Sequence, residues 1–164
     1  MLKSILFIFA LALVSSNRVT AQESNPPSAE HAAVVQVVQL FFDALHARDG
    51  DSLRRICQPG AQFTSGRASA DGYALRQRSV ESDIASFADL KETWLERMWK
   101  PTVHITGRIA MVWTRYDFHR SGKFSHNGTD CFTLLKTDAG WKIVCGAYSV
   151  EPGGMTENPA GPPH

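Results

Sequence analysis

The residues with the clearest chemical potential lie in the stretch 109–151. His126 and Asp130 place an imidazole and a carboxyl group four residues apart, a combination that can transfer protons. In a regular strand both side chains point to one face, about 13 Å apart at roughly 3.3 Å per residue. They make a dyad only if a bulge at Gly128 draws them together. Asp130 is therefore the one candidate catalytic residue, as an acid or a hydrogen-bond donor.

A structural role for Asp130 is the alternative. A buried carboxyl group needs a hydrogen-bond donor, faces water in a cavity, or has a raised pKa. Thr114 and Tyr116 on the preceding strand could supply the donor. In that case Asp130 is a satisfied structural acid, and the sequence leaves both roles open.

Three long β-strands would position these side chains. Runs of β-branched and aromatic residues are separated by turns at Ser121-Gly122 and 137–140, which is typical of a strand meander. Residues 102–106 predict a fourth strand, joined through Gly107-Arg108. One face of this sheet has the mixed apolar and polar composition of a ligand pocket, and its last strand contributes Cys145 and Ala147 to that face. The expected ligand contacts are Phe41, Thr114, Tyr116, Phe118, His126, Asp130 and Phe132.

The N-terminal half predicts helices that cover this sheet. Ser28 can cap a helix whose apolar residues recur at helical spacing through Phe41 and Leu45, and Asp49-Gly50 ends it. Residues 51–57 and a segment capped by Ser79 predict two shorter helices, with short strands at 61–64 and 73–78. Residues 91–100 fit either a helix end or a bent strand. The predicted fold class is α+β, with three helices packed on a curved antiparallel sheet of four long strands plus short strands.

The two ends of the chain differ from this domain. Residues 1–21 have the basic residue, apolar core and small residues of a signal peptide, and the apolar core is too short for a membrane span. A retained anchor is the alternative. We expect a linker at 22–27, a domain at 28–151 and a disordered tail at 152–164. The mature protein is then periplasmic or secreted and not bound to a membrane.

Export would place the three cysteines in an oxidising compartment. If Lys136 faces Trp141 across the last turn, Phe132 faces Cys145 and Cys131 points to the other side of the sheet. A disulfide between the two cysteines is then excluded, although a one-residue slip in register would change this result.

Other classes of function find no support in the 164 residues. The net charge of +1 and the scattered Lys and Arg residues argue against nucleic-acid binding. No metal-ligand spacing, nucleophile motif or phosphate-binding glycine loop occurs, so we expect no metal and no cofactor.

The C-terminal half carries a family resemblance. The segments from Gly107 to Phe118, from Gly122 to Leu134 and from Gly140 to Ile143 resemble exported bacterial members of the nuclear transport factor two superfamily, labelled "putative lumazine-binding" or SnoaL-like. The resemblance covers 28–151 and implies a cone-shaped α+β roll. It also places Asp130 where ketosteroid isomerase has the protonated aspartic acid of its oxyanion hole. Phe41 and Ser65 stand near that enzyme's catalytic tyrosine and its aspartate base, so two of the three working groups are absent.

Three functions follow as expectations. The first is an exported protein that binds a small apolar or aromatic molecule in the cone, with no catalytic set. The second is an isomerase or cyclase that uses Asp130 with a base not yet identified. The third is a homodimeric interaction module that pairs through the sheet, as the superfamily commonly does, with Trp113, Arg115 and His104 at the interface.

Overall fold

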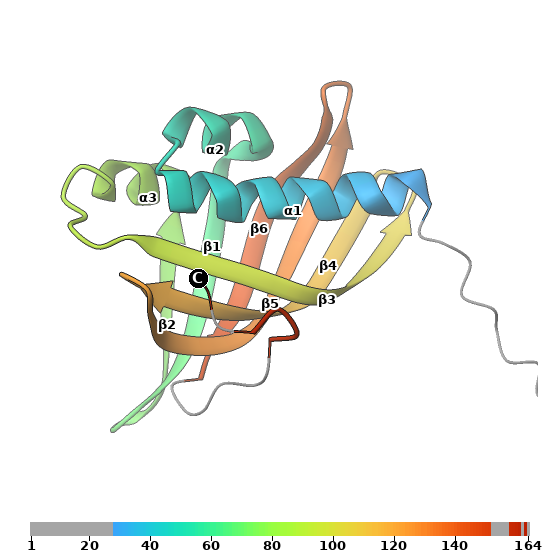
Figure 1. The fold of residues 1–164 in the computed structure, drawn as a ribbon. Coiled ribbons are helices and arrows are strands. Elements are labelled where there is room, and N and C mark those ends of the chain that lie inside the picture. The colour runs from blue at the N-terminus through green and yellow to red at the C-terminus, as the bar shows by residue number, and fades with distance from the viewer. Residues whose placement is uncertain (1–27, 152–157, 162, 164) are drawn as a thin grey trace, which may run out of the picture.

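The computed structural model describes residues 28–151, 158–161 and 163. The predicted signal peptide, the linker at 22–27 and most of the tail lie outside these residues. The elements follow in the order α1 (Ala29–Ala47), α2 (Gly50–Ile56), β1 (Cys57–Ser69), β2 (Gly72–Ser79), α3 (Val80–Ser86), β3 (Trp94–Thr106), β4 (Ile109–Arg120), β5 (Lys123–Thr137) and β6 (Gly140–Val150) (Figure 1).

The strands form one six-stranded sheet in the order β2-β1-β6-β5-β4-β3. The predicted meander of β3 to β6 is antiparallel, and the α+β class is confirmed. The sheet as a whole is mixed, because β1 pairs with β6 in parallel while β2 forms an antiparallel hairpin with β1. The predicted short strands at 61–64 and 73–78 are the central parts of β1 and β2.

Helix α1 lies across one side of the sheet, and α2 and α3 lie near the C-terminal end of α1 (Figure 1). The backbone N–H of His31 donates to Ser28 Oγ at 3.2 Å, which confirms the predicted cap. The predicted apolar stripe is buried at Val34, Val38, Phe41, Phe42 and Leu45. These side chains form the core together with the inward-facing residues of the sheet.

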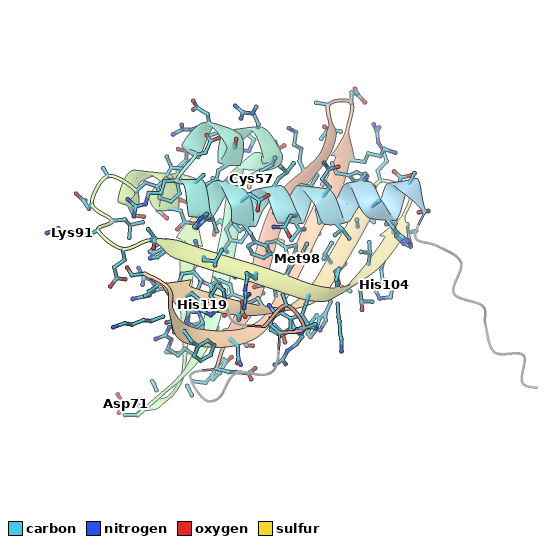
Figure 2. All side chains as sticks on the ribbon, in the orientation of Figure 1. Cys57, Asp71, Lys91, Met98, His104 and His119 are labelled. Carbon is cyan, nitrogen blue, oxygen red and sulfur yellow. The ribbon has the colours of Figure 1, made fainter. Side chains whose placement is uncertain are left out.

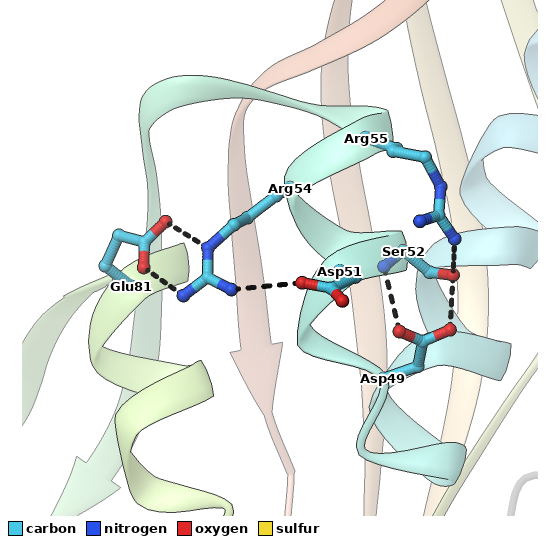
Figure 3. Close-up of polar contacts among 6 residues, drawn as sticks. All are labelled: Asp49, Asp51, Ser52, Arg54, Arg55 and Glu81. Carbon is cyan, nitrogen blue, oxygen red and sulfur yellow. Dashed lines mark hydrogen bonds and ion pairs between the residues drawn. The ribbon is translucent and has the colours of Figure 1, made fainter.

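The two short helices are tied together by polar contacts (Figure 3). Asp49 caps α2, since its Oδ1 accepts from the N–H of Ser52 at 2.9 Å. Arg54 on α2 donates through Nε and Nη2 to the two carboxylate oxygens of Glu81 on α3, at 3.2 and 2.9 Å. The pair is exposed, so it fixes the relative position of the helices more than it stabilises the fold.

Residues 94–100, which fitted two patterns in the sequence, are the first part of β3. The pairing of β3 with β4 is interrupted between Trp99 and Thr102, where Lys100 has a φ of 53° and Pro101 follows it. Pro101 therefore lies at an irregularity within an edge strand, where its missing N–H is tolerated. The same strand carries Glu96 toward the interior.

A bulge in β6 corrects the predicted register. Lys136 does pair with Trp141, but Leu134 pairs with Ile143 and Thr133 with Cys145, so Val144 is an extra residue. Cys145 and Ala147 consequently face outward, and Gly146 and Tyr148 take the inward positions. The prediction that Cys145 and Ala147 line the inner face is wrong for this reason.

No helix of the described ranges is long and apolar enough to span a membrane. At the C-terminal end, Asn158 Nδ2 donates to Asp117 Oδ2 at 3.2 Å, so this part of the tail contacts the sheet. Asp117 also receives two hydrogen bonds from Arg97 on β3.

Candidate functional site

A void of about 10 Å³ lies at the centre of the cone, with room for about one water molecule. Of the predicted contact residues, Phe41, Asp130 and Phe132 line it. Its other walls include Phe42, Phe63, Arg78, Glu96, Gly146 and Tyr148.

Aromatic rings from three elements make the apolar walls of this void. The centroid of Phe41 lies 4.9 Å from that of Phe63 and 5.5 Å from that of Phe132. The rings can pack closely because Gly146 on β6 has no side chain: a Cβ there would lie 2.6 Å from Phe63 Cδ1. The absence of a side chain at Gly146 therefore leaves space for the rings of Phe63 and Phe132.

Asp130 is a buried acid at the void, and its Oδ2 has no hydrogen-bond partner. The donors expected for it are used elsewhere. Thr114 Oγ1 donates to the carbonyl oxygen of Trp99 at 3.0 Å, and the Tyr116 hydroxyl donates to that of Ser149 at 2.8 Å. The hypothesis that Thr114 and Tyr116 satisfy Asp130 is therefore wrong.

Glu96 is the second carboxyl group at the void. Burial raises its pKa to about 7, with Asp117 and Asp83 adding repulsion and Arg78 opposing the rise. Burial also raises the pKa of Asp130 well above its usual range, and the charge of Glu96 adds to that effect. Two neighbouring acids with raised pKa values can hold a proton at neutral pH.

Arg78 on β2 is the cation of the site. It pairs with Asp83 on α3, and its Nε donates to the Tyr148 hydroxyl at 3.1 Å. Its guanidinium carbon lies 5.6 Å from the ring centre of Phe63 and 5.4 Å from that of Tyr148. Arg78 therefore forms one wall of the void by packing against the aromatic rings.

Three of the remaining predicted residues, Tyr116, Phe118 and His126, form a separate group. His126 stacks on Phe118 with 4.9 Å between ring centres and meets Tyr116 edge-on at 5.8 Å. Burial, with Arg67 and Arg120 nearby, lowers the pKa of His126 to about 4, so its ring is neutral at pH 7.

A bulge does occur in β5, but it is not at Gly128. It falls between the pairs of Phe118 with His126 and of His119 with Phe124, which leaves Ser125 as the extra residue. Gly128 pairs regularly with Tyr116, so His126 and Asp130 stay four strand residues apart. They form no dyad.

Glu96, Arg78 and Tyr148 were missed from the sequence. One signal was available for Glu96, because Trp94, Glu96 and Met98 alternate as inward residues of a strand with an acid between two large apolar side chains. Arg78 and Tyr148 gave no such signal, since their positions depend on the pairing of β1 with both β2 and β6.

Elsewhere among the described residues there is no metal-binding cluster of His, Cys, Asp and Glu side chains, and there is one larger void to consider. No three His, Cys, Asp or Glu side chains of those residues are placed to hold a metal ion. A larger void of about 160 Å³ lies between α2, the start of β1 and α3. Its charged residues, Arg54 and Glu81, are already paired with each other.

The architecture is that of the nuclear transport factor 2-like proteins. An NTF2-like protein from Cytophaga hutchinsonii superposes with a TM-score of 0.62 at 14% identity, over 74% of this chain and 98% of the other. An NTF2-like protein with a cystatin-like fold from Novosphingobium aromaticivorans gives 0.58 at 15% identity, over 80% and 85%. An NTF2-like superfamily protein from Salmonella enterica gives 0.56 at 16% identity, over 76% and 94%. These similarities establish the fold.

The chain belongs to the family described as "Putative lumazine-binding", whose model matches residues 29–149. This confirms the family and superfamily expected from the C-terminal motifs. No curated protein matches the chain.

Proposed function

We propose that this protein binds a small aromatic molecule in the cone, with Asp130 as its polar contact. The observation that carries the proposal is the unpartnered Oδ2 of a carboxyl group that is only 3% exposed. A buried polar atom without a partner costs free energy, which a ligand offering a hydrogen bond would recover. The family description is consistent with such a ligand.

The walls of the void favour a flat, apolar ligand. Phe41, Phe63 and Phe132 can contact the faces and edges of an aromatic ring. The void of about 10 Å³ is far smaller than such a molecule. Binding therefore requires a wall to move, and Arg78 is the candidate because its side chain is 24% exposed at the edge of the site.

Native mass spectrometry of the protein, purified from its producing cells without denaturation, tests this function. We expect a small molecule retained by the wild type and lost from Asp130→Asn and Phe132→Ala. Asp138→Asn is the control, because the Asp138 side chain is fully exposed. Retention by all four proteins would contradict binding in the cone. If no ligand is retained by the wild type, aromatic heterocycles are screened by thermal shift. At least one compound must raise the melting temperature of the wild type and not that of Phe132→Ala; otherwise the proposal fails.

An acid–base enzyme is the second candidate, favoured by the position of Glu96 beside Asp130. A carboxylate with a pKa of about 7 is suited to act as a general base near neutral pH. Proton abstraction from nitrobenzisoxazole, a general probe for a base in an apolar site, would test it. We expect the rate to rise through pH 7 and to vanish in Glu96→Gln. Equal rates in both proteins would rule out Glu96 as the base.

Two further proposals concern the protein outside the cone. We propose export through the signal peptide at 1–21, which N-terminal sequencing of the secreted form would test by finding Gln22 first. We also propose a homodimer through the outer face of the sheet. Three large apolar side chains support it, since Ile109, Trp113 and Leu135 are 50%, 52% and 44% exposed there.

A further inference from the structure

The bulge at Val144 brings two thiols to the same face of the sheet. Cys131 pairs with Ala147 and Thr133 with Cys145, and cross-strand partners share a face. Cys131 and Cys145 are therefore diagonal neighbours on the outer face, on adjacent strands. Cys145 is exposed, Cys131 is partly exposed, and both are free thiols.

The diagonal spacing is long for a disulfide. Diagonal residues of neighbouring strands are about 7–8 Å apart, whereas the Cα atoms of a disulfide are usually about 4.4–6.8 Å apart. A metal ion bound by two thiolates spans a longer gap, because each metal–sulfur bond is about 2.3 Å. The two thiols therefore fit a bridging ion better than a direct bond.

A third sulfur atom lies on the same face. Met111 on β4 pairs with Thr133 on β5, so it is a diagonal neighbour of Cys131. Cys131 lies on the middle strand, with Met111 on the strand to one side and Cys145 on the strand to the other. Its side chain is partly buried, and its unbranched thioether can reach toward a neighbouring strand. Soft thiolate and thioether ligands together select monovalent copper.

We propose that Cys131, Cys145 and Met111 form a binding site for a soft monovalent cation of the Cu(I) class. This site opens on the outer face of the sheet and does not depend on ligand binding in the cone, although Cys131 also borders the void and is the cross-strand partner of Trp113 on the face proposed for the dimer. Zinc is disfavoured, because it prefers four ligands and no cluster of three His, Cys, Asp or Glu side chains occurs among the described residues. The copper stays monovalent on binding: two thiols lose their protons to solvent, the two thiolates and the Met111 thioether each form a sulfur–copper bond, and the ion leaves its previous ligands.

The third cysteine provides a matched control. Cys57 follows α2 on the helical side of the sheet (Figure 2) and is buried. It pairs with Ile143 on the inner face, so it cannot reach an ion held by Cys131 and Cys145, and burial also raises the pKa of its thiol to about 12. A variant at Cys57 removes one thiol from the protein and leaves the proposed site intact.

Competition for Cu(I) against bathocuproine disulfonate, without oxygen and on the full chain, tests the site. We expect the wild type and Cys57→Ser to take up one ion per chain. Cys131→Ser and Cys145→Ser should take up none, and Met111→Leu should bind roughly tenfold more weakly. Circular dichroism melts would show that each variant is folded.

Two results would overturn the proposal. The first is a wild type that fails to compete, or uptake that survives in both Cys131→Ser and Cys145→Ser. The second is complete conversion of Cys131 and Cys145 to an intramolecular disulfide by glutathione disulfide, observed by peptide mass mapping. That result would show the two sulfur atoms close enough to bond directly.

Discussion

Thr114 and Asp130 are cross-strand partners in β4 and β5, yet the Thr114 hydroxyl donates to the carbonyl oxygen of Trp99 and not to Asp130. Because Asp130 Oδ2 has no partner in the protein, replacing the acid should break no contact at that atom. We expect Asp130→Asn not to lower the free energy of unfolding at pH 7, because no contact at that atom is lost and the neutral amide avoids the cost of burying the acid.

Asp83→Asn is the matched comparison for Asp130→Asn, since it weakens the ion pair with Arg78. We expect a loss of about 1.5 to 3 kcal/mol for this change. Urea unfolding of both variants at pH 7 gives the two values. A loss of that size in Asp130→Asn would show that the acid does have a structural partner.

Glu96 should make stability fall as pH rises. Burial raises its pKa from 4.5 to about 7, so the folded state holds this proton more tightly than the unfolded chain does. The contribution is complete below pH 4.5 and is lost as the pH rises to about 7. The slope across this window should be at most about 1.4 kcal/mol per pH unit.

Urea unfolding at several pH values measures that slope. Asp130 contributes in the same direction, because its pKa is also raised. We therefore expect Glu96→Gln to remove part of the slope and the double variant with Asp130→Asn to remove more. Glu92→Gln, an exposed change, should leave it intact. Identical slopes in all variants would disprove the raised pKa values.

Gly128 should resist substitution. A Cβ at this position would lie 2.1 Å from the carbonyl oxygen of Ser149 and 2.8 Å from Tyr116 Cε1. We expect Gly128→Ala to destabilise the protein by about 1 to 3 kcal/mol, because the backbone of β6 must shift. Thermal unfolding gives the measurement. Ala61→Gly, a buried change without added atoms, is a control that separates overpacking from a general sensitivity of the core.

The oligomeric state should depend on Trp113. Its side chain is 52% exposed on the outer face, so Trp113→Glu should place a charge in the proposed interface and give monomers. Sedimentation equilibrium measures the association. Leu75→Glu is the control, because Leu75 is 71% exposed on β2, and three strands lie between β2 and β4 in the sheet. A wild type that is monomeric at high concentration would exclude the dimer.

Local patterns in the sequence predicted most of the fold. The turn at Ser121-Gly122 is an example, since both residues have positive φ values, 47° and 75°, as a tight hairpin requires. The apolar spacing of α1 and the cap at Ser28 were equally local signals. Each depends on residues within a few positions of one another.

The candidate site was less predictable, because it depends on pairing between distant strands. The extra residue at Val144 is set by how β6 fits against β5, and it reverses the direction of Cys145 and Ala147. Glu96 was difficult to predict because Pro101 argued against a continuous strand through this segment. A proline is compatible with β3 only because the edge pairing with β4 is irregular at that point. The sequence pointed to Asp130, which lines the void, but not to the acid and the cation that line it too.

The parallel pairing of β1 with β6 joins residues such as Cys57 and Ile143, which are far apart in the chain. During synthesis β1 therefore cannot pair with β6 until this last strand has been made. Contacts of such long sequence separation slow folding, because a large loop must close before they form. Closure of the cone is thus expected to be a late step, and a chain that ends before β6 would lack the strand that joins the β1–β2 hairpin to the rest of the sheet.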